Sequence, residues 1–422
     1  MKITSPQAKT LLFFLISVFG IATTLSANSS HPNSNRFRGP DGSGLYSAPK
    51  LPASWTEKDY QWKLELPGDG QSSPMVWNDH LYLSSSDAGE PKPLLFCLDP
   101  KTGKLIWQKN FESLPHNLHQ NNSFSSSTTA VDQHHVYFVW SDNAHFQIAA
   151  INHDGEEVWR RNLGTNATQH GGGTSPIVFE NMVIVQNDCR GPSTNHALNR
   201  MTGKTVWKLD RPYEAKGKTS YSTPLIYQPD SDKPYIIFNS TSSGMTAVNP
   251  DNGHTLWQLP DLFTKRTIMS PIQVNDLVFS SCGDGNVGFY LVAVRPPKKT
   301  GGEAEIAYTI RKSVPYVPTP VAKGNHLFLV SDGGIATCID ASTGEEIWKE
   351  KLGDTYFSSP ICVDDRIYAV SRRADVVVFR AADEFELLGR TLINQGTNST
   401  PTVDNGRFYL RTDSHLYCLS GR

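Results

Sequence analysis

The sequence predicts an all-β protein, an eight-bladed β-propeller with four strands in each blade. The first observation is composition: 32 Gly and 27 Pro punctuate short runs of Val, Ile, Tyr, Phe and Trp, and no long helical period is present. The second is a recurring unit of a strand, a Gly-bearing turn and a strand that carries Trp, as in "LDPKTGKLIW". The third is spacing, since Trp62, Trp107, Trp159, Trp207 and Trp257 follow one another at intervals of 45 to 52 residues. Four strands over such an interval are typical of a propeller blade.

Residues 1–27 have the composition of a signal peptide. Lys2 and Lys9 flank the start of an apolar run at residues 11–22, and small residues suited to cleavage lie near Ser26 or Ala27. A transmembrane anchor is the alternative, but the run is shorter than the roughly 20 apolar residues that a spanning helix needs. No Cys lies in or directly after the segment. We therefore expect an exported protein of the periplasm or cell envelope, with no transmembrane anchor and not a lipoprotein.

Residues 28–58 form an N-terminal extension that we expect to fold as a cap over the ring. Within it, "RFRGPDGSGLYSAPKLPASW" at residues 36–55 contains a Gly-rich stretch similar to a phosphate-binding loop. A phosphate loop of that type needs a strand before it and a helix after it. Here a polar leader precedes the stretch and "LPASW" follows it, so a cap is the better interpretation.

Residues 59–422 contain the propeller, and eight unit openings mark its blades. Each opening consists of small residues, in most units followed by Pro. An alternating strand and a third strand come next, before the TG turn and the Trp strand. The openings are "SSPMVW" at Ser72, "SSTTAV" at Ser126, "TSPIVF" at Thr174, "STPLIY" at Ser222, "MSPIQV" at Met269, "PTPVAK" at Pro318, "SSPICV" at Ser358 and "STPTVD" at Ser399.

The eighth unit ends after its third strand, and the missing strand lies at the other end of the propeller. The last unit has neither a TG turn nor a Trp, whereas "YQWKLELPG" at residues 60–68 is a Trp strand with no unit before it. An N-terminal strand that supplies the outer edge of the last blade closes the ring and removes exposed sheet edges. Two blades depart from the pattern, because the fifth has Tyr308 in place of Trp and the seventh ends "FELLGRTL".

The recurring Gly and Trp residues are interpreted as structural. Gly permits the positive φ of a tight turn, and Trp combines a large apolar area with an N–H that needs a partner. We expect each indole to lie between two blades and to donate to the main chain of the neighbouring blade. The residues of this repeat motif are Trp62, Gly103, Trp107, Trp159, Gly203, Trp207, Gly253, Trp257, Gly344 and Trp348.

The six cysteines are interpreted as small buried hydrophobic residues. None belongs to a CxxC pair, a haem-attachment site or an adjacent Cys–Cys pair. Cys97, Cys338 and Cys418 occupy the same position of the repeat, so the architecture is expected to hold them apart. Free Cys is among the most buried residue types. Export allows a disulfide without requiring one, and the pairing state stays open.

The charge balance argues against a nucleic-acid partner. The chain has 39 Lys and Arg residues against 41 Asp and Glu residues, for a formal net charge of −2. No stretch concentrates basic residues into one face, as nucleic-acid binding or binding to an anionic membrane surface would require.

These repeats resemble the tryptophan-docking repeat of the PQQ-like, or quinoprotein-type, β-propeller superfamily. The resemblance extends over almost the whole chain after the signal segment. The stretch "RFRGPDGSG" of the N-terminal extension and the later "QHGGGTSP" and "SYSTPLIY" are similar to exported BamB-like proteins that begin with an FRGPxGxG element. The superfamily contains both PQQ-dependent alcohol dehydrogenases and BamB, so the resemblance implies the ring and leaves the activity open.

The candidate ligand site is the funnel mouth, where loops enter the innermost strand of each blade. Polar and aromatic groups that converge on a concave surface are typical of a binding site. Such residues also cap strand ends and bond one another, and this purely structural role is the alternative. The predicted funnel residues are His119, Asn121, His170, Tyr221, Arg266, Tyr316, Tyr356 and Asn398.

A non-catalytic binding or scaffold module of the periplasm or envelope is the preferred function. It is similar to BamB in repeat number and export signal, and it departs from BamB in lacking the lipid-anchor Cys. Other envelope proteins are the expected partners, and a small molecule or glycan in the funnel is a further expectation. No catalytic residue, metal site or cofactor is predicted.

Two enzymatic alternatives stay open. A PQQ- and Ca²⁺-dependent dehydrogenase would need carboxylate and amide ligands for calcium and, by the resemblance, an adjacent-Cys disulfide. The funnel loops are poor in carboxylates, with Asp354 as one of the few. A carbohydrate-active propeller enzyme would need a carboxylate pair or a base with a charge stabiliser, and His170, Tyr221 and Arg266 are the residues available for the latter.

Overall fold

The computed structural model describes residue 1 and residues 34–86, 90–211, 219–230, 233–299 and 301–421. The predicted signal segment, apart from Met1, lies outside the described residues. Within these ranges the only helix is a short 3-10 turn, η1 (Glu57–Asp59), and none is long and apolar enough to cross a bilayer.

The first four blades take up the chain from Met75 to Leu259. Blade 1 consists of β3 (Met75–Trp77), β4 (His80–Ser86), β5 (Pro93–Leu98) and β6 (Leu105–Asn110). Blade 2 consists of β7 (Ala130–Val131), β8 (His135–Ser141), β9 (Phe146–Asn152) and β10 (Glu157–Asn162). Blade 3 consists of β11 (Ile177–Phe179), β12 (Met182–Asn187), β13 (Ser193–Asn199) and β14 (Thr205–Arg211). Blade 4 consists of β15 (Leu225–Tyr227), β16 (Tyr235–Ser240), β17 (Gly244–Val248) and β18 (Thr255–Leu259).

The other four blades follow in the same order. Blade 5 consists of β19 (Ile272–Val274), β20 (Leu277–Asp284), β21 (Val287–Arg295) and β22 (Glu305–Ile310). Blade 6 consists of β23 (Val321–Lys323), β24 (His326–Val330), β25 (Ile335–Asp340) and β26 (Glu346–Lys351). Blade 7 consists of β27 (Ile361–Val363), β28 (Arg366–Val370), β29 (Val376–Arg380) and β30 (Leu387–Thr391). Blade 8 contains β31 (Thr402–Asp404), β32 (Arg407–Arg411) and β33 (His415–Ser420), and its fourth strand is β2 (Tyr60–Glu65).

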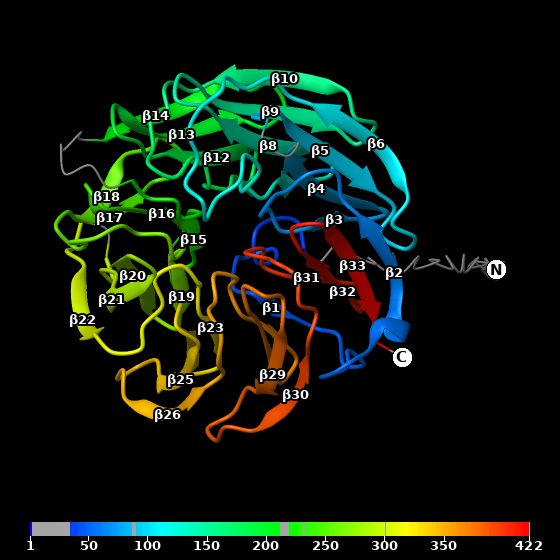
Figure 1. Ribbon diagram of the computed structural model, residues 1–422. Helices are drawn as coiled ribbons and strands as arrows, with labels where there is room; N and C mark the ends of the chain where they lie inside the picture. Colours follow the sequence, from blue (N-terminus) through cyan, green and yellow to red (C-terminus); the bar gives the residue numbers. More distant parts are fainter. Residues whose placement is uncertain (2–33, 87–89, 212–218, 231–232, 300, 422) are drawn as a thin grey trace. The chain divides into compact units, whose positions relative to one another are not determined.

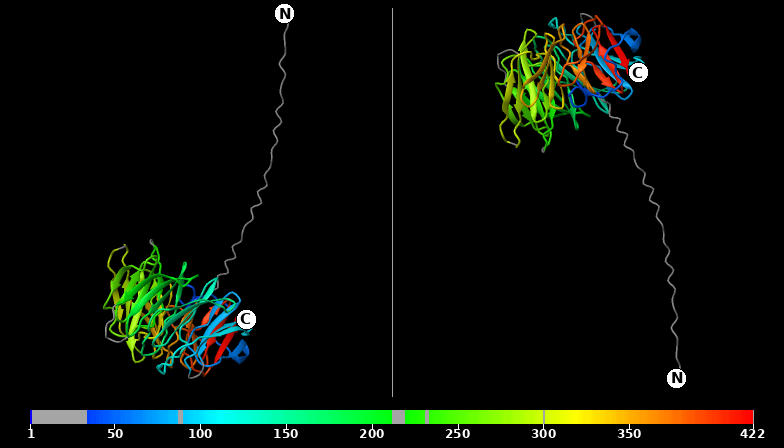
Figure 2. Two further views of the ribbon diagram at one scale, coloured as in Figure 1. Left: turned by 90° about the horizontal axis from the view of Figure 1, so that it is seen from above. Right: turned by 90° about the horizontal axis from the view of Figure 1, so that it is seen from below.

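The eight antiparallel sheets surround a central axis, with the short first strand of each blade innermost (Figure 1). Two views turned by 90° look at the ring from its edge, and the strands run between its two faces (Figure 2). The N-terminal strand β2 pairs with the C-terminal strand β33, where Trp62 lies opposite Cys418 and Leu64 opposite Leu416. The predicted fold, including closure of the ring by the N-terminal strand, is confirmed.

The indole of most outer strands donates to a carbonyl of the next blade. Trp107 Nε1 lies 2.8 Å from His153 O, and Trp159 Nε1 lies 3.0 Å from Arg200 O. The ring of the indole covers the Gly of that next turn, so a Cβ at Gly103 would lie only 2.7 Å from Cε3 of Trp62. The Gly is therefore required twice, for its positive φ and for the close approach of the indole.

Two positions depart from this pattern. Trp257 donates instead to the Tyr235 hydroxyl of its own blade, at 3.2 Å. Here the expectation of a bond to the neighbouring main chain is wrong, and the connection between β21 and β22 in blade 5 is longer than the turn of blade 1 and contains Pro296 and Pro297. Tyr308 takes the place of a Trp, and its hydroxyl donates to Ala341 O at 2.5 Å while its ring covers Gly344.

The small residues of the unit openings form a hydroxyl ring around the axis. In six junctions a backbone N–H at the opening of one blade donates to the Ser or Thr hydroxyl at the opening of the next, at 2.9 to 3.1 Å. The opening motif therefore joins neighbouring blades at their inner ends, as the Trp residues join them at their outer strands. The accepting hydroxyls belong to Thr128, Ser175, Ser270, Thr319, Ser359 and Thr400.

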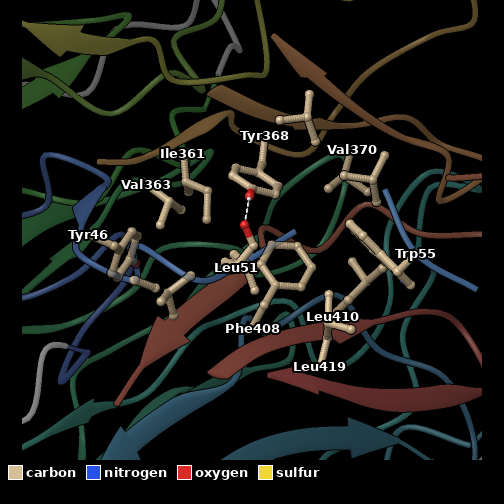
Figure 3. Close-up of a cluster of buried hydrophobic side chains, with 14 of the residues drawn as sticks. Tyr46, Leu51, Trp55, Ile361, Val363, Tyr368, Val370, Phe408, Leu410 and Leu419 are labelled. Carbon is tan, nitrogen blue, oxygen red and sulfur yellow. Dashed lines mark hydrogen bonds between the residues drawn. The ribbon is translucent and has the colours of Figure 1, made fainter. Parts of the chain in front are cut away.

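The N-terminal extension divides into an inner and an outer part. Residues 34–44 contact the inner strands of several blades, and β1 (Leu45–Tyr46) then pairs in parallel with β27 as a fifth, innermost strand of blade 7. Residues 46–55 pack between blades 7 and 8, where Tyr46, Leu51 and Trp55 join the apolar side chains of both blades (Figure 3). The Tyr368 hydroxyl donates to Leu51 O at 3.3 Å. The predicted cap thus has its first part inside the ring.

Arg38 fixes the inner part of the N-terminal extension to the ring. Its guanidinium is fully buried, and all five N–H groups reach carbonyl oxygens. Three of these belong to the openings of blades 6 and 7 and two to the extension itself: Thr319 O and Pro360 O at 2.9 Å, Pro320 O at 2.6 Å, Ser43 O at 2.9 Å and Gly42 O at 3.3 Å. Burial lowers the pKa of Arg38 to about 10, which leaves it charged at neutral pH.

All six cysteines are buried and free, as expected for small hydrophobic residues. Cys97 lies opposite Trp107 and Cys338 opposite Trp348 in their blades. Burial raises the pKa of both thiols to about 12, so neither is a thiolate at neutral pH.

Candidate functional site

A cavity of about 410 Å³ occupies the centre of the ring on the side of the loops that enter the inner strands. This volume falls within the roughly 300 to 1,000 Å³ of small-molecule sites. Its lining contains residues from the openings or loops of every blade, together with Phe37 of the N-terminal extension.

Seven of the eight predicted funnel residues line this one cavity: His119, Asn121, His170, Tyr221, Arg266, Tyr316 and Asn398. Tyr356 does not, because its side chain is 1% exposed and packs in the apolar cluster between blades 6 and 7. The next residue along the chain, Phe357, faces the cavity in its place. Their function as ligand contacts stays a prediction.

Phe37 stands between two buried arginines. Arg36 and Arg38 are 4% and 1% exposed, whereas Phe37 is only partly buried and lines the cavity. The apolar ring of Phe37 lines the cavity, whereas the charged side chains on either side of it are turned away and buried. This reverses the usual order of burial. Gly42 and Gly44 make this possible, because a Cβ on either would lie 2.6 Å from the guanidinium of Arg36 or Arg38.

One wall is formed by imidazole and phenol rings. The rings of His119 and His170 have centroids 4.5 Å apart, and His170 meets the ring of Tyr221 edge to face at 5.9 Å. Burial and the positive charge of Arg266 lower the pKa of His170 to about 4, so the imidazole is neutral at pH 7. Burial raises the pKa of Tyr221. Neither ring is poised to exchange a proton near neutral pH.

Arg266 is the buried charge of this wall. Its Nη1 lies 3.1 Å from the Tyr316 hydroxyl, its Nη2 lies 2.7 Å from Gln169 Oε1, and Asp284 Oδ1 is 3.8 Å from Nη1. Burial raises the pKa of Tyr316 to about 12. The carboxylate of Asp332 accepts the backbone N–H groups of Tyr316 and Val317 at 2.6 and 3.2 Å and so holds this loop in place.

The long connection between blades 1 and 2, which carries His119, builds the adjoining part of the wall. Asn121 in this connection accepts a hydrogen bond from Arg372 Nη2 of blade 7 at 3.1 Å. Arg372 Nε also donates to Asn398 Oδ1 at 3.2 Å, and its guanidinium lies over the ring of Phe357 at 4.4 Å. Asn122 donates to His170 O and Gly172 O at 2.6 and 3.0 Å, which ties the same loop to blade 3.

Several lining residues were missed from the sequence: Phe37, Gln71, Asn122, Gln169, Asp284 and Phe357. Gln169, Asn122 and Phe357 lie next to predicted residues, so adjacency in the same loops is a signal that could have found them. Phe37 had no such signal, since the N-terminal extension was expected to form a cap over the ring.

The lining does not fit a quinone–calcium centre. Calcium takes six to eight oxygen ligands, mostly carboxylates and carbonyls, and Asp284 is the only carboxylate among the described residues that line the cavity. Asp354 lies outside the lining, and no group of three or more His, Cys, Asp or Glu residues suited to a metal was found in the described part of the chain. A glycosidase pair is likewise missing from the described lining, because it would need a second carboxylate.

A sequence profile of the family described as "Outer membrane protein assembly factor BamB" matches residues 91–350 and 309–384. The chain belongs to this family. The match covers most of the ring, and it agrees with the PQQ-like repeats found in the sequence.

Individual relatives are distant. Outer membrane protein assembly factor BamB of Yersinia pestis is 21% identical over 329 residues, which are 76% of this chain and 67% of the relative. The same-named protein of Shewanella oneidensis is 27% identical over 212 residues, 46% of this chain and 49% of the relative. The aligned part of the chain therefore spans about two thirds of the length of the first relative and about half of the second.

The solved structures that share the fold of this chain belong to proteins of two kinds. BamB from Moraxella catarrhalis superimposes with a TM-score of 0.58 at 15% identity, over 85% of this chain and 96% of that one. A europium-containing methanol dehydrogenase superimposes with a TM-score of 0.69 at 11% identity, over 92% and 98% of the chains. At such identities the likeness is one of fold alone, and it fits a binding propeller and a dehydrogenase equally.

Proposed function

We propose that this protein is a non-catalytic binding module of the periplasm or cell envelope and that the central cavity is its ligand site. The observation that carries the proposal is the chemistry of the cavity wall. Three ionisable groups of the wall are held away from proton transfer at neutral pH: His170 as a neutral imidazole, and Tyr221 and Tyr316 as neutral phenols.

Two further facts support a binding function. The relatives at 21% and 27% identity are both named assembly factors of outer membrane proteins, which favours envelope proteins as partners. The single carboxylate of the described lining supplies neither a calcium cage nor an acid–base pair.

Native mass spectrometry on protein purified from the exported fraction tests the proposal. We expect no change in mass when PQQ and Ca²⁺ are added, no oxidation of primary alcohols, and a co-purifying envelope protein. A mass increase that matches one PQQ and one Ca²⁺, reversed by a chelator and accompanied by alcohol oxidation, would instead establish the dehydrogenase alternative.

A further inference from the structure

The lining of the cavity combines the aromatic ring of Phe37 with hydroxyl groups from six blades. The six hydroxyls that join the inner ends of neighbouring blades also line the cavity around Phe37. Each accepts a backbone N–H from the blade before it, and the structure gives its own O–H no acceptor among the described residues. The cavity therefore offers O–H donors from six blades and one apolar ring in the same lining.

The amides of the wall add further donors. Gln169 Oε1 accepts hydrogen bonds from Arg266 and Arg190, at 2.7 and 3.3 Å, so its NH₂ group stays available. Asn121 Oδ1 accepts from Arg372, and its NH₂ group has no hydrogen bond within the described part of the chain. Because three arginines donate to these two amide oxygens, the wall presents amide nitrogens, which favours a ligand rich in acceptor oxygens.

Arg266 differs from the structural Arg38 in how its donors are used. Arg38 places all five N–H groups on carbonyls, whereas within the described part of the chain Arg266 uses two of its five, in hydrogen bonds to Tyr316 and Gln169. Its side chain is 5% exposed and its Nε is buried without a partner. Asp284, 41% exposed and 3.8 Å away, lies beyond hydrogen-bond distance. A buried guanidinium with unused donors at a cavity wall favours an anionic ligand group.

We propose that the cavity binds a sugar acid, a carboxylated polyol ring, with a C–H face on Phe37 and the carboxylate at Arg266. A sugar ring carries hydroxyls around its edge and C–H groups on its faces, which matches a lining that combines hydroxyl donors from six blades with the aromatic ring of Phe37. A flat aromatic acid would leave the hydroxyl ring unused. The inference rests on the proposed function, since it names the ligand class of that binding site.

Isothermal titration calorimetry with the full chain tests the proposal, using galacturonate, trigalacturonate, galactose and the methyl ester of galacturonic acid. The ester keeps the ring and removes the charge. We expect the acid to bind at least about tenfold more tightly than the ester. Tighter binding of trigalacturonate than of galacturonate would identify a polysaccharide as the source, and equal binding a free sugar acid.

Two variants separate the contributions of the Phe37 ring and the Arg266 charge to ligand affinity. Phe37→Ala is expected to weaken the acid and the ester alike by at least about tenfold, and Arg266→Gln to abolish the preference for the acid. Phe289→Ala, an exposed Phe outside the cavity, and Arg295→Gln, in a surface pair with Asp276, are matched controls without effect. If Arg266→Gln does not fold, the acid–ester comparison on the unsubstituted protein and Phe37→Ala still decide the question.

The outcomes distinguish this inference from the proposed function. Equal binding of acid and ester, unchanged binding by Phe37→Ala, or no binding of any sugar acid would overturn the sugar-acid assignment. So would binding of free PQQ in place of the sugars. A co-purifying envelope protein would leave the proposed function standing in each of these cases. Turnover of a bound sugar acid, detected by mass spectrometry of the products, would contradict the non-catalytic function and retain the ligand class.

Discussion

At the scale of single residues, the N-terminal extension is held in the ring by two buried arginines, Arg36 and Arg38, that donate to carbonyls at the openings of the blades. The carbonyls at the blade openings point toward the axis, and the Pro in most openings has no N–H with which to serve a neighbour. Arg38 collects three of those carbonyls from two blades. Its charge is stabilised by oriented carbonyl dipoles, with no carboxylate in hydrogen-bond contact.

Arg38→Lys is expected to lower the free energy of unfolding by about 3 kcal/mol, because an ammonium has three donors and cannot span five carbonyls. Urea denaturation followed by Trp fluorescence measures the change. Arg160→Lys, a surface residue bonded to Glu157, is the control and should change stability by less than about 0.5 kcal/mol. Equal effects would mean that the carbonyl contacts contribute nothing specific.

His196 predicts a pH dependence of stability. Burial lowers its pKa in the folded protein to about 4, and its side chain is 5% exposed. The unfolded chain, with a His pKa near 6.5, therefore binds more protons between pH 6.5 and 4, and stability falls as the pH falls through that window. Relative to His196→Gln, the unsubstituted protein should lose about 3 kcal/mol between pH 7 and 4. Denaturation of both proteins at the two pH values checks this difference, and a constant difference would contradict it.

At the scale of elements, the sequence predicts the Trp strand and the turn before it because both have local sequence signals. Alternating apolar residues, a Gly at a turn and a Trp on the following strand recur with the blade period, and the structure places them as expected except at Trp257. The position of the N-terminal extension could not be predicted in this way. No local pattern in "RFRGPDGSG" indicates that the carbonyl partners of Arg38 are supplied by residues 319, 320 and 360.

The cavity was predictable to the level of the loop and not of the side chain. The blade order brings the loops to one mouth, so seven of eight residues were found. Tyr356 failed because successive residues of an extended segment face opposite ways, and one position decides whether a ring enters the core or the cavity. The orientation of these side chains depends on packing between blades 6 and 7, which the sequence of a single loop does not predict.

The turn glycines offer a direct test of the indole contact. Gly103→Ala should destabilise by about 2 to 4 kcal/mol, since it adds strain at a positive φ of 70° and a Cβ 2.7 Å from Trp62. Gly324→Ala has a φ of 58° and no atom within 4 Å of the added Cβ, so only the strain of about 1 kcal/mol applies. Thermal unfolding of both variants gives the comparison. Equal losses of stability in the two variants would show that the indole of Trp62 can move aside without destabilising the protein.

At the scale of the whole molecule, the ring closes where β2, from the N-terminal part of the chain, completes blade 8. Every other outer strand is continuous with its own blade on the chain, whereas β2 meets β33 only through the sheet and the packing around it. The apolar clusters lie between adjacent blades, so each blade depends on both neighbours. Opening at β2 would leave blade 8 with an unpaired edge and one neighbour fewer.

Trp62→Phe and Trp348→Phe compare the closing junction with an internal one. Both remove an indole donor to the next blade, at 3.2 Å to Pro100 O and 2.9 Å to Ala382 O, and both keep an aromatic ring. A loss of about 1.4 kcal/mol in either variant corresponds to tenfold faster local opening.

In Trp62→Phe this loss should act on a strand that can leave its blade, so amide exchange in β2 and β33 should accelerate about tenfold. In Trp348→Phe the chain continues into blade 6 on one side and blade 7 on the other, and exchange in β26 should change less. Equal acceleration at both junctions would mean that the closing strand is no weaker than any other strand of the ring.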